Sequence, residues 1–267
     1  MMEQIKKWLV AVAMTAMLCG TMAGCKADAG RPVNGTFEGP IGKGTPPEAV
    51  LAAAKKMTVT DERVETVMED KASGVAVYSL LNCSDEVSSE GYGMLIAKGD
   101  VPTALPQIRH GRMPRARFDA ATGDLWIVGS DIDGTGVSVE RLYLLRFGAD
   151  GHADIVGEVD PYEIQQALCQ MLSYSIKGQD ITFIAEGKQL VTVTNKMEDM
   201  GGFMDDAIYI GEQIAYSIEG PLTVHVTPGV NFVVGKILHY EDMPTISATV
   251  TMNDNGGVTL SDIKAEQ

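Results

Sequence analysis

The sequence predicts an α+β fold that is mainly antiparallel β, with meander-type sheets or an open barrel and two short helices. After residue 57, apolar and polar residues alternate in many short runs, and this period of two is typical of strands. Clusters of Asp, Gly and Ser separate the runs at about 8–12 residues, which favours antiparallel meanders. Helical signals occur in two segments.

The first predicted helix begins in Thr45-Pro46-Pro47-Glu48. Thr45 and Glu48 have the spacing of a capping box, and Pro46 suits the first helical position. The Ala-rich run that follows ends at Lys56, whose charge suits the negative end of the helix dipole. The second predicted helix begins at Pro161, and Tyr162, Gln165, Leu168, Cys169 and Leu172 follow near a spacing of three to four.

Strands account for most of the remaining chain. They are predicted at 57–60, 75–78, 92–96, 124–128, 139–147, 174–176, 181–184, 190–194, 207–218, 222–226, 232–238, 245–252 and 258–260. Residues 101–117 interrupt the pattern with three prolines and hold the cationic cluster of the chain, so we expect an irregular segment and a domain subdivision near it.

The N-terminal residues have the pattern of a secretory signal. Two lysines precede an apolar run over residues 8–18, which is shorter than the about 20 residues of a membrane-spanning helix. Met22-Ala23-Gly24-Cys25 then resembles the lipobox of bacterial lipoproteins, with Met22 where Leu is usual. In that family the Cys thiol is diacylated and becomes the mature N-terminus. The resemblance implies that Cys25 is lipidated and holds the protein on membrane lipid; the alternative is a plain cleaved signal.

Three segments follow from this interpretation. Residues 1–25 form a lipoprotein signal peptide, residues 26–44 a flexible tether rich in Gly and Pro, and residues 45–267 a β-rich extracytoplasmic domain. The formal net charge of −15 predicts repulsion from phosphate backbones, so we expect no nucleic-acid partner. It also means that attachment to anionic lipid would depend on acyl chains rather than on basic residues.

A calcium loop is one reading of the segment that begins at Asp131. Asp131, Asp133 and Glu140 match the later part of the pattern Asp-x-Asp-Gly-x5-Glu. Gly129, however, occupies the first ligand position, and the flanking residues are β-patterned where that loop needs helices. We therefore interpret the segment as a hairpin turn and expect no cofactor, with calcium as the alternative.

The cationic cluster and the cysteines leave further alternatives. The cluster could bind an anionic glycan or a teichoic-type polymer, because the Arg fork matches phosphate. We favour the simpler interpretation that its arginines offset nearby carboxylates. Cys83 and Cys169 are expected as two separately buried thiols, with one disulfide as the alternative. The candidate anion-binding residues are Arg109, Arg112, Arg115 and Arg117.

Four phrases resemble a known family when they are taken together: 139–143, 159–162, 197–202 and 226–230. They are similar to an extracytoplasmic C-terminal region of membrane metallopeptidases of the β-lactam-sensor (antirepressor) class in Gram-positive bacteria. The similarity covers residues 117–262, but the chain has neither the family's zinc motif, His-Glu-x-x-His, nor its transmembrane helices. The resemblance therefore implies a surface-displayed sensory or binding domain and no peptidase activity.

We expect a cell-envelope lipoprotein whose β-rich domain binds or senses a ligand or partner at the outer face of the membrane, without catalysis. A membrane sensor protein and a cell-wall component are the expected partners. The alternatives are an envelope hydrolase with a carboxylate pair among the 36 acidic residues, and an accessory subunit of a membrane sensor. Carboxylates about 5–10 Å apart in a cleft would indicate the hydrolase, and an exposed apolar patch the subunit.

Overall fold

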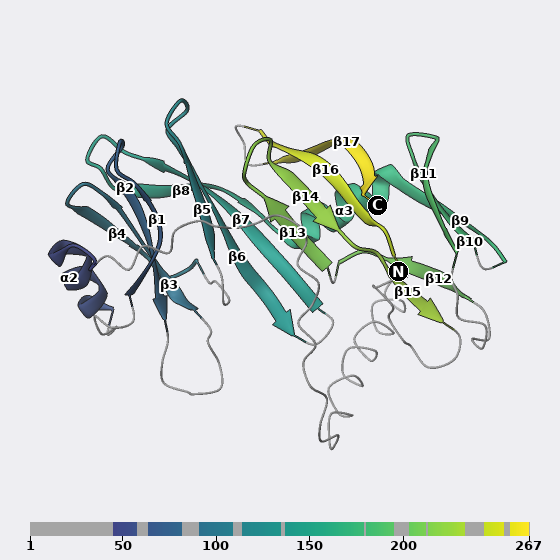
Figure 1. Ribbon diagram of the computed structural model, residues 1–267, viewed down its shortest axis with the longest axis horizontal. Helices are drawn as coiled ribbons and strands as arrows, with labels where there is room; N and C mark the ends of the chain where they lie inside the picture. The colour runs from purple at the N-terminus through teal and green to yellow at the C-terminus, as the bar shows by residue number, and fades with distance from the viewer. Residues whose placement is uncertain are drawn as a thin grey trace, which may run out of the picture. The chain divides into compact units, whose positions relative to one another are not determined.

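The fold is mostly antiparallel β-sheet with two short helices in the part of the chain that the structure describes, which confirms the predicted class. The structure is a computed structural model (Figure 1). It describes residues 45–57, 64–81, 91–108, 114–134, 137–178, 180–194, 203–211, 213–232, 243–253 and 257–266. All of them belong to one unit, Gly39–Gln267.

The first sheet is a four-stranded antiparallel meander in the order β1-β2-β3-β4. One helix, α2 (Glu48–Lys56), covers one of its faces through the buried Val50 and Ala54, which pack in a cluster with Tyr78 and Leu95. The opposite face packs against the next sheet. The strands are β1 (Val64–Asp70), β2 (Val75–Leu81), β3 (Gly91–Lys98) and β4 (Val101–Leu105).

The predicted capping box of α2 is wrong. The helix is capped at Pro47 and begins at Glu48, with no hydrogen bond from a capping side chain. The two adjacent prolines explain the shift, because a residue that precedes proline is kept out of the helical region. Pro46 therefore cannot be the first helical residue, and Thr45 lies too early to cap. Met57, predicted as the start of a strand, is the C-cap of this helix, and residues 58–60 lie outside the described part.

The expectation of an irregular segment over 101–117 is wrong at both ends. β4 occupies its start and pairs with β3, with Pro102 opposite Ala97. β4 is an edge strand, where a missing N–H interrupts no ladder on the outer side, so it tolerates the proline. The other end of the segment enters β5 (Arg115–Asp119).

The largest sheet has eight strands. Its first half is formed by β5, β6 (Asp124–Gly134), β7 (Val137–Phe147) and β8 (Ala153–Val159). β6 and β7 pair as far as Gly134 opposite Val137, which confirms the predicted hairpin turn. The sequence pattern did not predict β1 and β8. The second half consists of β13 (Gln213–Ser217), β14 (Thr223–Val226), β16 (Thr245–Met252) and β17 (Val258–Glu266).

The two halves meet where β13 pairs with β7 in parallel. This pairing covers only two positions, Gln213 with Ser138 and Ile214 with Val139. From Leu142 onward β7 pairs with β8 instead. Because β6 already occupies the other edge of β7, we infer that β8 and β13 share one edge and that β13 must leave β7 where β8 begins.

The second helix, α3 (Pro161–Met171), follows β8 directly and begins as predicted. Asp160 is its N-cap, and one carboxylate oxygen accepts a hydrogen bond of 2.8 Å from the N–H of Tyr162. Ile164 and Leu168 are buried in the main core, together with Leu142 of β7. The helix is where the sequence predicted it, but the predicted face is only partly right, since Leu168 is buried while Tyr162 and Cys169 are exposed.

The hairpins after α3 form two smaller sheets. β9 (Leu172–Lys177), β10 (Asp180–Ala185) and β11 (Lys188–Thr194) confirm the predicted hairpin units. The predicted strand 207–218 is divided into β12 (Phe203–Tyr209) and β13, with Gly211 at a φ of +146° between them. β12 pairs with β15 (Gly229–Phe232), and residues 233–238 lie outside the described part. None of the helices in the described ranges has the length and hydropathy needed to span a membrane.

Candidate functional site

The candidate site is a set of side chains that hydrogen-bond to the backbone of β13 and of the turn after it. Arg115 and Arg117 are two residues apart on β5, so their side chains leave the same face of the strand. Arg115 donates to the carbonyl oxygen of Tyr216 at 2.8 Å and to Oε2 of Glu140 at 2.5 Å. The same Glu140 oxygen accepts from the N–H of Tyr216 at 2.7 Å.

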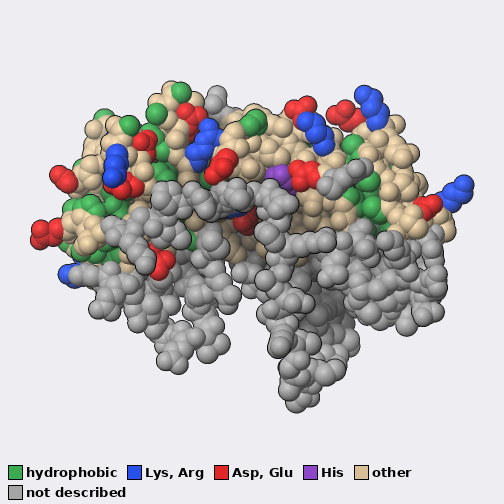
Figure 2. Space-filling model, viewed as in Figure 1, with side chains coloured by type: hydrophobic (Ala, Val, Ile, Leu, Met, Phe, Trp, Pro, Cys, Tyr) green, Lys and Arg blue, Asp and Glu red, His purple; other side chains and the backbone are tan. Residues whose placement is uncertain are grey.

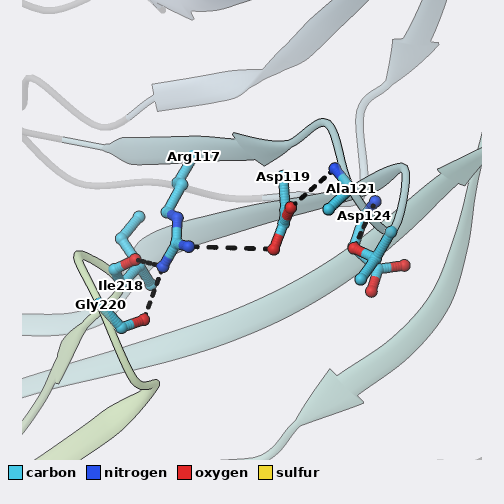
Figure 3. Close-up of polar contacts among 7 residues, drawn as sticks. Arg117, Asp119, Ala121, Asp124, Ile218 and Gly220 are labelled. Carbon is cyan, nitrogen blue, oxygen red and sulfur yellow. Dashed lines mark hydrogen bonds and ion pairs between the residues drawn. The ribbon is translucent and has the colours of Figure 1, made fainter.

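Arg117 repeats the arrangement one step along the strand. Figure 3 shows its guanidinium directed at two backbone carbonyls, and Nη1 donates to the oxygens of Ile218 and Gly220, each at 2.6 Å. Its Nη2 lies 3.9 Å from Oδ2 of Asp119, which makes a weaker ion pair. Asp119 is itself engaged in its turn, where Oδ1 accepts from the N–H of Ala121 at 2.9 Å.

We name these contacts the arginine seam: the side chains of Arg115, Arg117 and Glu140 with the backbone of residues 216–220. β13 pairs with β14 along one edge up to Ser217, but on its other edge it leaves β7 after two paired positions. The backbone groups on that second edge therefore need partners other than a strand. The seam supplies them, since its side chains satisfy the N–H and C=O of Tyr216 and two further carbonyls. It therefore closes the edge of β13 that faces away from β14.

The seam includes partly buried charge. The side chains of Arg115 and Glu140 are each 21% exposed. Burial raises the pKa of Glu140, and the opposing effects of the Arg115 charge, the Tyr216 N–H and His225 do not cancel it. Burial, with the nearby Glu140 charge, also raises the pKa of Tyr216, whose hydroxyl is buried and makes no hydrogen bond in the structure. The seam thus surrounds a buried phenol that has no polar partner.

Three further contacts between basic and acidic side chains involve the strands of this sheet. Arg141 on β7 contacts both Glu158 and, at 3.2 Å, Asp160, so it connects β7 with β8 and with the cap of α3. His225 on β14 has Nδ1 3.0 Å from Oε1 of Glu266, although the geometry is not that of a hydrogen bond. The two carboxylates beside Arg141 are half exposed and share one cation, which is the arrangement of a surface ion-pair network.

Only some of the predicted site residues lie in the part of the chain that the structure describes. Arg115 faces a carboxylate, as the simpler interpretation of the cationic cluster holds. Anion binding by the cluster stays a prediction, because Arg109 and Arg112 lie outside the described residues. Cys25 and Cys83 lie outside them as well.

The calcium reading also stays a prediction. Asp131 and Asp133 lie on β6, but the structure does not describe their side chains. Glu140 on β7 already contacts Arg115. Within the described ranges, no group of three His, Cys, Asp or Glu residues is placed to hold a metal ion.

The expectation of a buried Cys169 is wrong. Its thiol is free and its side chain is exposed on α3. The buried face of this helix consists of Pro161, Ile164 and Leu168, and the residue after Leu168 is turned about 100° away from that face. The helical position therefore decides the exposure of Cys169 against the tendency of free cysteine to be buried.

A second candidate is an exposed apolar edge on the sheet of β9, β10 and β11. Tyr174 is 37% and Ile176 is 36% exposed on β9, while their cross-strand partners Phe183 and Ile181 on β10 are buried. Elsewhere the described surface is mixed: acidic and basic side chains are interspersed on the face drawn in Figure 2. β9 thus combines apolar side chains with the edge of a sheet.

Sequence reasoning did not find the part that Tyr216 and Glu140 play in the seam. The bonds at Tyr216 use its backbone, which every residue type provides, and no motif marks such an acceptor. No family model, curated protein or solved structure matches this chain.

Proposed function

We propose that this protein is a cell-envelope lipoprotein whose β-rich domain binds a partner at the outer face of the membrane, without catalysis. The observation that carries the proposal is the order of a basic start, an apolar run and Met22-Ala23-Gly24-Cys25 at the N-terminus. Acylation of Cys25 would hold the acidic domain at the lipid surface, and residues 26–44 would give it reach.

Binding is favoured over catalysis by the way charged side chains are used. Arg115 and Glu140 hydrogen-bond to each other and to backbone groups. Glu158 and Asp160, a candidate carboxylate pair, face the same Arg141 guanidinium. A catalytic acid or base must be free to reach the reacting atoms of a substrate, and these carboxylates already contact an arginine. These groups serve the fold in the geometry described.

An accessory subunit of a membrane sensor is the second candidate. It is favoured by exposed apolar side chains, because a contiguous apolar patch on a protein surface marks a site of protein contact. Among the described residues, the exposed large apolar side chains are Val156 on β8, Tyr162 at the start of α3, and Tyr174 and Ile176 on β9, with Tyr162 the most exposed at 63%. A protein partner fits these side chains better than a charged cell-wall polymer does.

The anchor is tested by the variant Cys25→Ser. We expect the wild-type chain to incorporate labelled palmitate and to sediment with membranes, and the variant to lose the label and enter the medium. Cys169→Ser is the matched control, since it removes an exposed cysteine on α3 and should leave labelling unchanged. Labelling that persists in Cys25→Ser would show that the anchor lies elsewhere.

The binding proposal has its own measurement. Cys25→Ser protein, once released, is screened for a thermal shift with cell-wall fragments, β-lactams and calcium, and the anchored wild-type protein is cross-linked in its membrane. A shift with a cell-wall fragment or a β-lactam supports ligand binding, and a specific cross-linked membrane protein supports the accessory subunit. If no ligand shifts the melting temperature and no membrane protein is cross-linked, a binding function is contradicted.

A further inference from the structure

Among the strands that the structure describes, β9 is an edge strand of its sheet and pairs with β10 alone. The order of the sheet is β11-β10-β9, and β9 pairs with β10 at six consecutive positions without a register shift. In an antiparallel pair, alternate residues direct their N–H and C=O groups away from the partner. β9 therefore presents a straight row of backbone donors and acceptors at the open edge of the sheet.

The other edge strands of the three larger sheets have features that discourage pairing. Natural sheets protect their edges with bulges, prolines and charges. Bulges or register shifts occur in the pairings of β1, β8, β11 and β17; Pro102 lies in β4; and β5 carries Arg115, Arg117 and Asp119. β9 has a continuous register, no proline and one charged residue, Lys177, at its end.

The side chains of β9 favour an apolar partner on one face. Leu172, Tyr174 and Ile176 alternate along the strand and so share a face, and they pair across to buried apolar residues of β10. Ser173 and Ser175 lie on the other face. An added strand with the same alternation would continue the apolar face of the sheet and cover Tyr174 and Ile176.

We infer that β9 is a self-association edge, at which β9 of a second copy of this chain pairs antiparallel about a two-fold axis. The pattern of β9 fits itself: an axis through Tyr174 sets Leu172 opposite Ile176, and an axis through Ser175 sets Tyr174 opposite Ile176. Both registers keep apolar residues beside apolar residues, and the contact closes on itself as a symmetric dimer.

Charge favours antiparallel over parallel pairing of two β9 strands, and it favours contact at β9 over contact elsewhere on the acidic surface. Antiparallel pairing places the two Lys177 side chains at opposite ends of the contact, whereas parallel pairing would place them side by side. The chain as a whole has a formal charge of −15, so two copies repel each other over most of their surface. The hairpins of this sheet are locally neutral, because Lys177 and Lys188 balance Asp180 and Glu186.

The size of β9 limits the strength of the contact. A stable protein interface buries about 1,600 Å², and a pair of six-residue strands covers much less. We therefore expect weak association in solution and stronger association on a membrane, where anchoring raises the effective concentration. Only the membrane effect rests on the proposed lipid anchor; the pairing itself does not.

The test uses the full mature chain with Cys25→Ser, so that lipidation plays no part. Sedimentation velocity over a concentration series up to about millimolar should show a reversible monomer–dimer equilibrium. Ile176→Lys, which places a charge opposite an apolar residue of the partner strand in either register, should weaken the dimer at least tenfold, a change of about 1.4 kcal/mol. Val156→Lys is the matched control, because Val156 is 44% exposed on β8, where the register shifts, and this variant should dimerise normally.

A spin label at Ser175 locates the contact. In either register the two labels lie on opposing strands, so a short inter-label distance is expected in the dimer and should disappear in Ile176→Lys. Circular dichroism and thermal melting confirm that each variant is folded. A chain that stays monomeric over the series, an equal effect of both lysine variants, or a long distance between the labels would each overturn the inference. A lack of palmitate labelling would contradict the anchor and leave this result intact.

Discussion

Removing the carboxylate of Glu140 tests whether the arginine seam holds β13 in place. Glu140→Leu leaves the Arg115 guanidinium without its carboxylate and the N–H of Tyr216 without an acceptor. Breaking a fully buried ion pair costs about 3–5 kcal/mol. The two side chains here keep 21% of their surface exposed, so screening lowers that range, and the orphaned N–H adds about 1–2 kcal/mol. We expect a total loss of about 3 kcal/mol in the free energy of unfolding.

The magnitude is measured by urea unfolding of four proteins: wild type, Glu140→Leu, Arg115→Met and the double variant. Each single change leaves a charge without its partner, whereas the double change leaves none. The double variant should therefore be more stable than the sum of the single losses predicts, with a coupling energy of about 1–3 kcal/mol. Additive losses, or a Glu140→Leu protein within about 0.5 kcal/mol of wild type, would refute the seam as an energetic unit.

Three further predictions concern pH, geometry and packing. Because burial raises the pKa of Glu140, the folded state binds its proton more tightly than the unfolded state does. The stabilisation that the protonated Glu140 contributes is fully present below the pKa of this group in the unfolded state, and it is lost as pH rises through the higher pKa of the folded state. Glu140→Gln should thus gain stability relative to wild type between pH 4 and pH 7 in urea titrations, and a relative loss would contradict the sign. Arg117→Lys should lower stability by about 1–2 kcal/mol, because a single ammonium cannot take the place of both Nη1, which donates to two carbonyls, and Nη2, which faces Asp119; an unchanged unfolding midpoint would contradict a stabilising role of these Arg117 contacts. Gly157→Ala should cost at most about 1 kcal/mol, since the added Cβ would lie 2.3 Å from Cε of Met252, the end of a flexible side chain that can move aside, and Met252→Ala should remove that cost; a larger loss that Met252→Ala does not relieve would contradict this account.

Elements defined by neighbouring residues could be predicted from the sequence. The start of α3 at Pro161 is a local signal that the structure follows, whereas the face of the helix that is buried depends on the core against which it packs. The β6–β7 hairpin follows from an Asp/Gly turn between two apolar runs in the same way. Local chemistry also explains the error at α2, where a rule about adjacent prolines outweighs the capping pattern that starts at Thr45.

Elements that depend on distant partners could not be predicted. Pro102 counts against a strand unless the strand lies at an edge, and the position of β4 in its sheet is a tertiary fact. Arg115 and its backbone acceptor on Tyr216 are 101 residues apart, and no pattern near either residue marks the other. The sequence identified a cationic cluster, therefore, but not whether its arginines bind an external anion or the chain itself.

The shared edge of β7 gives a physical reason for a charged seam in a largely apolar core. β13 can pair with β7 only up to Val139, since β8 pairs with the strand from Leu142 onward. Beyond that point β13 keeps its ladder with β14, but its edge toward β7 has no strand partner, and non-directional hydrophobic burial would leave the backbone groups of that edge unsatisfied. Hydrogen bonds from Arg115 and Glu140 to both backbone groups of Tyr216 hold that edge. The energetic cost of partly burying these charges is thus offset by a defined position for the strand, which is the role in which buried ion pairs are best attested.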